Sequence, residues 1–237
     1  MKIKYRSIEF FGVPGSGKSF LRKKIKTNLK LKGYKVFDAR EIIVTFIGRY
    51  VPLKMSLKIN LILFNLLLLV NIKTTLWNKS LNRICNIYKN NNLKKFNYYR
   101  KKISFLYNKN ILINQSTKHI WLDELIIASM LFQKIRRDNE NVIYFPDEGF
   151  LQRLMLLAFS KKKINLKLIK KYLKNKIFCD KIVYIYAPKN NIYEVNERRR
   201  LSKDRKSIDK KIIEKIIYLN KKIKKIISHK CINYKND

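Results

Sequence analysis

The chain has 237 residues, 46% of them hydrophobic, so it can bury a sizeable core and wholesale disorder is excluded. Its formal net charge of +39 suits nucleic acid or an anionic membrane surface, but the lysines are scattered along nearly the whole sequence, which is typical of compositional drift. The three cysteines lie far apart without a CxxC pair, which argues against a disulfide framework and a zinc site. A reducing cytoplasmic location is therefore the default expectation.

The first predicted elements enclose the most informative motif. Residues 7–11 predict a buried strand, and residues 17–32 predict a helix that ends before Gly33. Between them, Gly12 to Ser19 reads GVPGSGKS and matches G-x-x-x-x-G-K-[ST]. Three of the chain's 6 glycines fall in this octapeptide. A strand–loop–helix context is what a phosphate-binding P-loop needs.

The residue types in this loop predict binding of a nucleoside triphosphate. Glycines permit positive φ and close backbone approach, so that successive N–H groups and the helix N-terminus converge on phosphates. We expect Lys18 to reach the β- and γ-phosphates and the Ser19 hydroxyl to bind Mg²⁺. A glycine-rich turn that matches by accident is the alternative. The predicted nucleotide-binding residues are Gly12, Val13, Pro14, Gly15, Ser16, Gly17, Lys18, Ser19 and Phe20.

The sequence from residue 35 to residue 137 predicts mostly helices. Residues 35–38 read as a short strand, and residues 40–50 as a helix. An apolar helix is expected over 56–76; its run from Ile59 to Ile72 is too short to span a membrane and predicts a buried or interfacial helix. Weak periodicity over 77–118 completes a predicted helical insertion at about 50–118. A helix over 119–137 follows.

A second candidate motif ends the apolar, β-rich run 141–145, which predicts a buried parallel strand. The chain then reads Pro146-Asp147-Glu148-Gly149. A P-loop enzyme needs a carboxylate beside the loop, and we expect Asp147 to hold Mg²⁺ directly or through water. Glu148 is the alternative, as a base toward water or as a supporting group. Asp147 could instead only cap the helix that starts near Gly149.

The rest of the chain alternates between helices and strands. Helices are predicted over 149–160, 165–176, 190–203 and 207–228, and strands over 181–186 and 231–234. This alternation predicts a single α/β domain over 1–237, a sandwich around a mostly parallel sheet.

Four arginines gather in a chain otherwise dominated by lysine: Arg198, Arg199, Arg200 and Arg205. Arginine binds phosphate oxygens in a bidentate way, and on a helix Arg198 and Arg205 share a face. We therefore expect one or both of these two to contact nucleotide and act in catalysis. A solvated basic helix face is the alternative.

Together these motifs resemble the P-loop kinase group that includes adenylate, thymidylate and deoxynucleoside kinases. The resemblance covers residues 7–38 and 141–205 and is specific only at the loop. It implies a P-loop NTPase three-layer sandwich with an about five-stranded parallel sheet, a lid segment at about 190–206, and use of ATP-Mg²⁺ to transfer the γ-phosphoryl group. Phe20 departs from the group, where many members carry a second Thr, and no acceptor motif of the group matches residues 40–118.

The favoured hypothesis is an ATP-dependent kinase with Lys18, Asp147, Glu148, Arg198 and Arg205 as catalytic candidates. Its small-molecule acceptor would bind near Asp38, Arg40 and Glu41 and against the insertion at about 50–118. Asp38 either orients an acceptor hydroxyl or merely ends a strand. A regulatory ATPase and a nucleic-acid-linked ATPase stay open as alternatives, as does weak association with a membrane surface. A GTPase is disfavoured, because the sequence has no N-K-x-D motif.

Overall fold

The computed structural model describes residues 6–69, 75–111, 113–138, 141–160, 165–173, 179–186, 188–201, 209–228 and 231–235. Its strands are β1 (Ile8–Phe11), β2 (Lys35–Phe37), β3 (Val142–Tyr144), β4 (Lys181–Tyr186) and β5 (Cys231–Lys235). Its α-helices are α1 (Lys18–Leu31), α2 (Ala39–Phe46), α3 (Met55–Leu69), α4 (Thr75–Asn91), α5 (Leu93–Lys102), α6 (Gln115–Arg137), α7 (Phe150–Arg153), α8 (Leu166–Leu173), α9 (Lys189–Leu201) and α10 (Lys210–Ile227). Short 3₁₀ segments cover Ile47–Arg49, Ser104–Tyr107 and Leu154–Phe159.

The strands pair in parallel, as the sequence predicts for an α/β chain. One sheet has the order β1-β4-β5, and a second consists of β2 and β3. Among the described residues, one parallel bridge between Ser7 and Tyr144 links the two sheets, and the Tyr144 N–H donates to the Arg6 carbonyl at 2.7 Å. The described strands thus form two ladders joined at one point rather than one continuous five-stranded sheet. Pro146 follows closely and has no N–H with which to extend the ladder.

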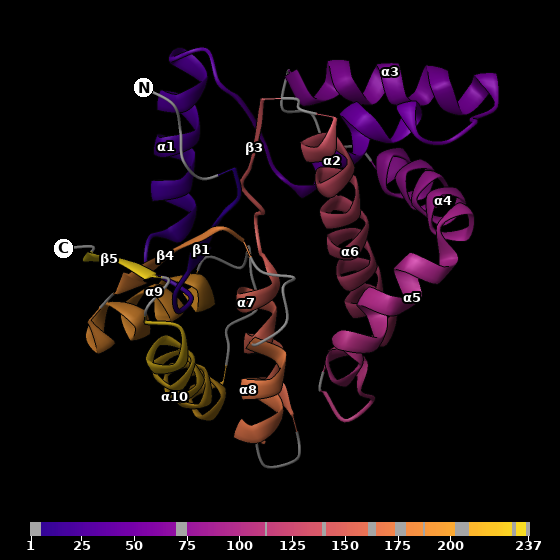
Figure 1. The fold of residues 1–237 in the computed structure, drawn as a ribbon. Helices are drawn as coiled ribbons and strands as arrows, with labels where there is room; N and C mark the ends of the chain where they lie inside the picture. The colour runs from indigo at the N-terminus through magenta and orange to yellow at the C-terminus, as the bar shows by residue number, and fades with distance from the viewer. Residues whose placement is uncertain are drawn as a thin grey trace.

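Because its side chains point alternately to the two faces of the sheet, β1 contributes to a separate hydrophobic cluster on each face. Phe10 packs in a small cluster with Leu21 of α1 and Ile143 of β3. Its neighbour Phe11 belongs to the larger cluster, formed with α2, α6 and α10. Consecutive strand residues point to opposite faces. Figure 1 shows α1 on one side of β1 and β3, and α2 and α6 on the other.

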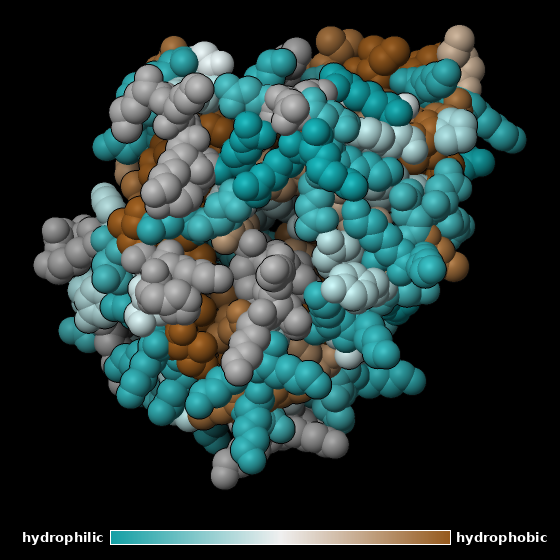
Figure 2. Space-filling model, in the orientation of Figure 1, coloured by the Kyte–Doolittle hydropathy of each residue, from teal (hydrophilic) through white to brown (hydrophobic). Residues whose placement is uncertain are grey.

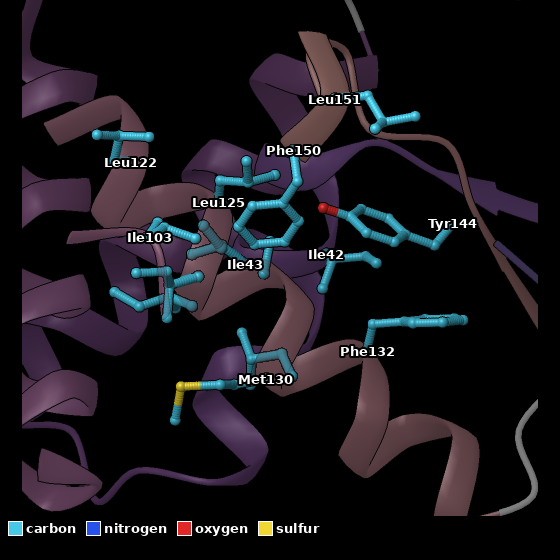
Figure 3. Packing of buried hydrophobic residues seen from close by; sticks show 14 of the residues in the cluster. Ile42, Ile43, Ile103, Leu122, Leu125, Met130, Phe132, Tyr144, Phe150 and Leu151 are labelled. Atoms are coloured by element: carbon cyan, nitrogen blue, oxygen red, sulfur yellow. The ribbon is translucent and has the colours of Figure 1, made fainter. Parts of the chain in front are cut away.

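The larger cluster holds the region after β3 in place. Ile42 and Ile43 of α2 and Leu125 of α6 are almost fully buried. In Figure 3 these side chains and the ring of Phe150 gather between the helices, and the phenol of Tyr144 points toward Phe150. Phe150 begins α7, so the core fixes the start of the segment that follows Asp147 and Glu148.

The described part of the predicted insertion is helical. The helix predicted over 56–76 corresponds to α3 up to Leu69, and α4 begins at Thr75; residues 70–74 lie outside the described part, so the prediction is not tested there. The helix predicted from residue 119 begins earlier, at Gln115. Within the described residues, none of the helices has both the length and the hydropathy that crossing a bilayer requires.

Candidate functional site

The loop between β1 and α1 has the backbone that its glycines predict. Gly15 and Gly17 have φ values of 88° and 83°, in the left-handed region that favours glycine. Gly12 has a different constraint: a Cβ atom there would lie 2.5 Å from the carbonyl oxygen of Ile185 and 2.8 Å from the Oγ of Ser16. The loop conformation therefore disfavours larger residues at all three positions, most strongly at Gly12, where the nearest contact is with backbone.

Polar groups converge on the inside of this loop. The Nζ atom of Lys18 donates a hydrogen bond to the carbonyl of Val13 at 2.7 Å, so the ammonium group folds back across the loop. Ser16 is fully buried, and its Oγ atom has no hydrogen-bond partner. The N-cap of α1 is Gly17, which supplies no side-chain acceptor to the first N–H groups of the helix. A buried unpaired hydroxyl and an uncapped helix N-terminus fit an anion such as phosphate.

Asp147 reaches α1 one helical turn from Ser19. Its carboxylate forms an ion pair with Arg22, which lies three residues after Ser19 and so on the same side of the helix. Asp147 is half exposed. The N-cap alternative is wrong, because α7 begins at Phe150 with Gly149 as its cap and no side-chain cap hydrogen bond. The position beside the loop thus agrees with the predicted metal-holding role, which itself stays a prediction.

Arg22 sits at the centre of a group of carboxylates that sequence reasoning missed. Burial lowers the pKa of Arg22, and the nearby carboxylates of Asp38, Glu41 and Glu148 act in the opposite direction. Three chain segments therefore place acids around this one guanidinium: the end of β2, the start of α2 and the turn after β3. The sequence offered no signal for Arg22, because it is one basic residue among many in α1.

Glu148 forms an ion pair with a different arginine from the one that pairs with Asp147. Its carboxylate pairs with Arg153 of α7 at 2.7 Å. The guanidinium of Arg153 lies over the ring of Trp121, 5.2 Å from its centroid, and the side chain is only 13% exposed. Arg153 was also missed by the sequence analysis. It directs Glu148 toward α7, whereas Asp147 is directed toward α1.

Asp38 and Glu41 have structural partners. They form a capping box at the start of α2, in which the Glu41 N–H donates to Asp38 at 3.0 Å and the Asp38 N–H donates to Glu41 at 2.7 Å. Both carboxylates also pair with Lys26 of α1. Arg40 pairs with Glu124 of α6 at 3.6 Å. These contacts favour the strand-end role of Asp38 over the role of orienting an acceptor.

A buried acid lies beneath the turn that carries Asp147 and Glu148. Glu9 of β1 has no exposed surface, and its Oε1 atom accepts a hydrogen bond from the Gln152 N–H at 2.9 Å. A Cβ atom on Gly149 would collide with its carboxyl group. Burial raises the pKa of Glu9 to about 8, although the N–H groups of Gln152 and Leu151 and the charge of Arg153 oppose the shift. Glu9 interrupts an apolar strand, and that was the signal that could have found it.

The predicted lid begins close to the loop. Helix α9 starts at Lys189, soon after β4 ends at Tyr186, and Val195 of this helix packs on Gly15. Arg198 lies in α9, but its side chain is outside the described part of the structure, as is the whole of Arg205. The roles of these two arginines therefore stay predictions.

No protein-family model matches this chain, and the search of curated proteins finds no match.

In the described part of the chain, no cluster of three or more His, Cys, Asp and Glu side chains could hold a metal ion. The metal-holding roles of Ser19 and Asp147 therefore stay predictions.

Proposed function

We propose that this chain is an ATP-dependent kinase that transfers the γ-phosphoryl group to a small-molecule acceptor. The observation that carries the proposal is the loop itself, where positive φ at Gly15 and Gly17 accompanies a Lys18 ammonium folded across the carbonyl of Val13. This geometry, in a strand–loop–helix context, is suited to binding phosphate through backbone N–H groups and one cation.

The order of the strands supports the finer assignment to a P-loop NTPase sandwich. If the Ser7–Tyr144 bridge is taken as the link between the sheets, the order is β2-β3-β1-β4-β5. The chain leaves β1 toward β2 on one side and leaves β3 toward β4 on the other. Ligands of open parallel sheets bind outside the carboxyl ends of strands at such a reversal. The loop and Asp147 follow β1 and β3, the two strands at this point.

Each residue of the site has a proposed task. The loop N–H groups and Lys18 would hold the phosphates, while Ser19 and Asp147 would hold Mg²⁺, which supplies charge neutralisation when bound. Arg22 would orient Asp147 through their ion pair. Arg198 or Arg205 would bring a guanidinium to the transferring group from the lid.

The position of Glu148 favours a kinase over a water-activating ATPase. The Asp147 carboxylate pairs with Arg22 of α1, the helix that follows the loop, whereas the Glu148 carboxylate pairs with Arg153 of α7. Asp147, on the side of α1, is better placed to act at the phosphates.

The test is a transfer assay with γ-labelled ATP, Mg²⁺ and a panel of nucleosides, nucleotides, sugars and polar lipids. The proposal predicts one acceptor class that becomes labelled and that stimulates release of ADP. Release of free phosphate at the same rate with every acceptor would instead support an ATPase. Binding of nucleic acid that weakens steeply with salt, with stimulation of turnover, would support the nucleic-acid-linked alternative.

A further inference from the structure

Helix α3 carries an exposed apolar stripe. Five of its side chains are between 49% and 73% exposed: Met55, Ile59, Ile62, Leu63 and Leu66. Their spacing places them on one face of the helix. The opposite face is buried, since Leu57, Leu61 and Phe64 are part of the core. In Figure 2 brown, hydrophobic atoms gather at the upper right, over α3. Clustered apolar exposure of this kind marks an interaction surface.

The charged residues of the segment that carries this stripe all have one sign. Lys54 and Lys58 are exposed beside it. Residues 42–122, which include α3, α4 and α5, contain 14 Lys and Arg but neither Asp nor Glu. All 16 acidic residues of the chain lie outside this segment. Compositional drift explains abundant lysine, but it does not explain an insertion from which acids are absent.

From these two observations we propose that α3 docks the protein on an anionic lipid surface, with the stripe entering the interface and the lysines meeting the headgroups. An apolar helix face combined with cationic residues is what binds such a surface. A second copy of the chain fits less well, because it would bring the same acid-free, cationic segment against itself. Nucleic acid would use the charge but would leave the aliphatic stripe exposed. The inference does not depend on the proposed kinase activity.

The experiment measures binding of the purified full chain to vesicles by co-sedimentation. One set of vesicles contains phosphatidylcholine only, and the other contains phosphatidylcholine with phosphatidylglycerol. We expect binding to the second set and little binding to the first. Replacing both lysines, in the variant Lys54→Gln/Lys58→Gln, should weaken binding by about fivefold for each lysine.

The decisive comparison is between two triple variants. The stripe variant, Ile59→Gln/Ile62→Gln/Leu66→Gln, should lower the partition coefficient about tenfold or more. The control variant, Leu31→Gln/Leu168→Gln/Tyr218→Gln, removes three side chains on other helices that are also exposed, and it should bind as the parent does. Both sets of changes lie on the surface, and circular dichroism verifies that both variants fold.

A tryptophan at the stripe gives an independent measurement. In Ile62→Trp the added fluorescence should shift to shorter wavelength with phosphatidylglycerol vesicles, whereas in Leu31→Trp it should not. Equal binding by the stripe and control variants, or no binding to either set of vesicles, would overturn the proposal. So would a dimer in sedimentation equilibrium that the stripe variant abolishes, because it would make a second copy the occupant of this face.

Discussion

Val195 of α9 packs directly on Gly15 of the loop. A Cβ atom added to Gly15 would lie 3.1 Å from the Cβ atom and 3.2 Å from the Cγ1 atom of Val195. The loop and the first part of the predicted lid are therefore in contact, and a change at Gly15 affects both. This contact links the element that would bind phosphate to the element that would close over it.

The substitution Gly15→Ala should therefore damage both stability and nucleotide binding. An L-residue with positive φ costs about 1–2 kcal/mol, and Val195 leaves little room for the methyl group. Gly33→Ala is the matched control, because Gly33 has a φ of 79° at the end of α1 and no atom within 4 Å of the added Cβ. Thermal unfolding and ATP titration should show that Gly33→Ala loses stability only. Unchanged ATP affinity in Gly15→Ala would remove this glycine from the site.

The lid interpretation predicts a change in backbone protection. Hydrogen exchange across α9 should slow when a non-hydrolysable ATP analogue and Mg²⁺ are added, because closure would order this segment. Arg198→Lys or Arg205→Lys should lower turnover, since lysine lacks the planar guanidinium. Equal protection in both states, with full turnover in lysine variants of all four arginines, would make residues 190–206 a solvated basic segment.

Because Asp147 and Glu148 have separate partners, replacing each carboxylate with its amide should affect turnover unequally. Asp147→Asn should lower turnover by roughly 10²-fold or more with less effect on ATP affinity, because metal positioning acts mainly in the transition state. Glu148→Gln should cost less, since its carboxylate pairs with Arg153. Steady-state kinetics with ATP-Mg²⁺ measure both. A larger effect at Glu148 would favour the water-activating ATPase.

Much of the fold was predictable because its signals are local. The strands β1, β3 and β4 are apolar runs, and Gly33 and Pro146 mark where elements end. The motif from Gly12 to Ser19 specified the loop, since its glycines are needed for its backbone.

The partners within the site could not be predicted, because they depend on tertiary contacts. Arg22 and Arg153 are two of 55 basic residues, and nothing in the sequence distinguishes them. Only the fold brings them to Asp147 and Glu148. Glu9 stands out in the sequence as an acid within an apolar strand, but its position beneath Gly149 depends on how the turn after β3 folds back over β1.

Glu9 predicts a pH dependence of stability. Its pKa is about 8 in the folded protein against an ordinary value of 4.5. Between these values the folded protein binds more protons than the unfolded chain, so the free energy of unfolding falls as the pH rises through this window. Glu9→Gln keeps a hydrogen-bond acceptor for Gln152 but cannot ionise. It should be more stable than the parent at pH 8, by an amount on the order of a few kcal/mol.

The check on Glu9 is chemical denaturation of both proteins across this window. The difference between Glu9→Gln and the parent should shrink as the pH falls and vanish below pH 4.5, where the parent carboxyl becomes protonated in the unfolded state as well as in the folded state. A difference that does not change with pH would mean that Glu9 is not buried as a neutral acid.

Turnover in Lys18→Ala and Ser19→Ala is the most direct test of whether the loop binds ATP-Mg²⁺ for catalysis. Both side chains lie outside the core, so each variant should fold, and Lys18→Ala also loses the hydrogen bond to the carbonyl of Val13. Lys24→Ala, on the same helix, is the matched control and should keep its activity. Lys18→Ala and Ser19→Ala should lose detectable phosphoryl transfer. Turnover near the parent value in either folded variant would contradict this role of the loop.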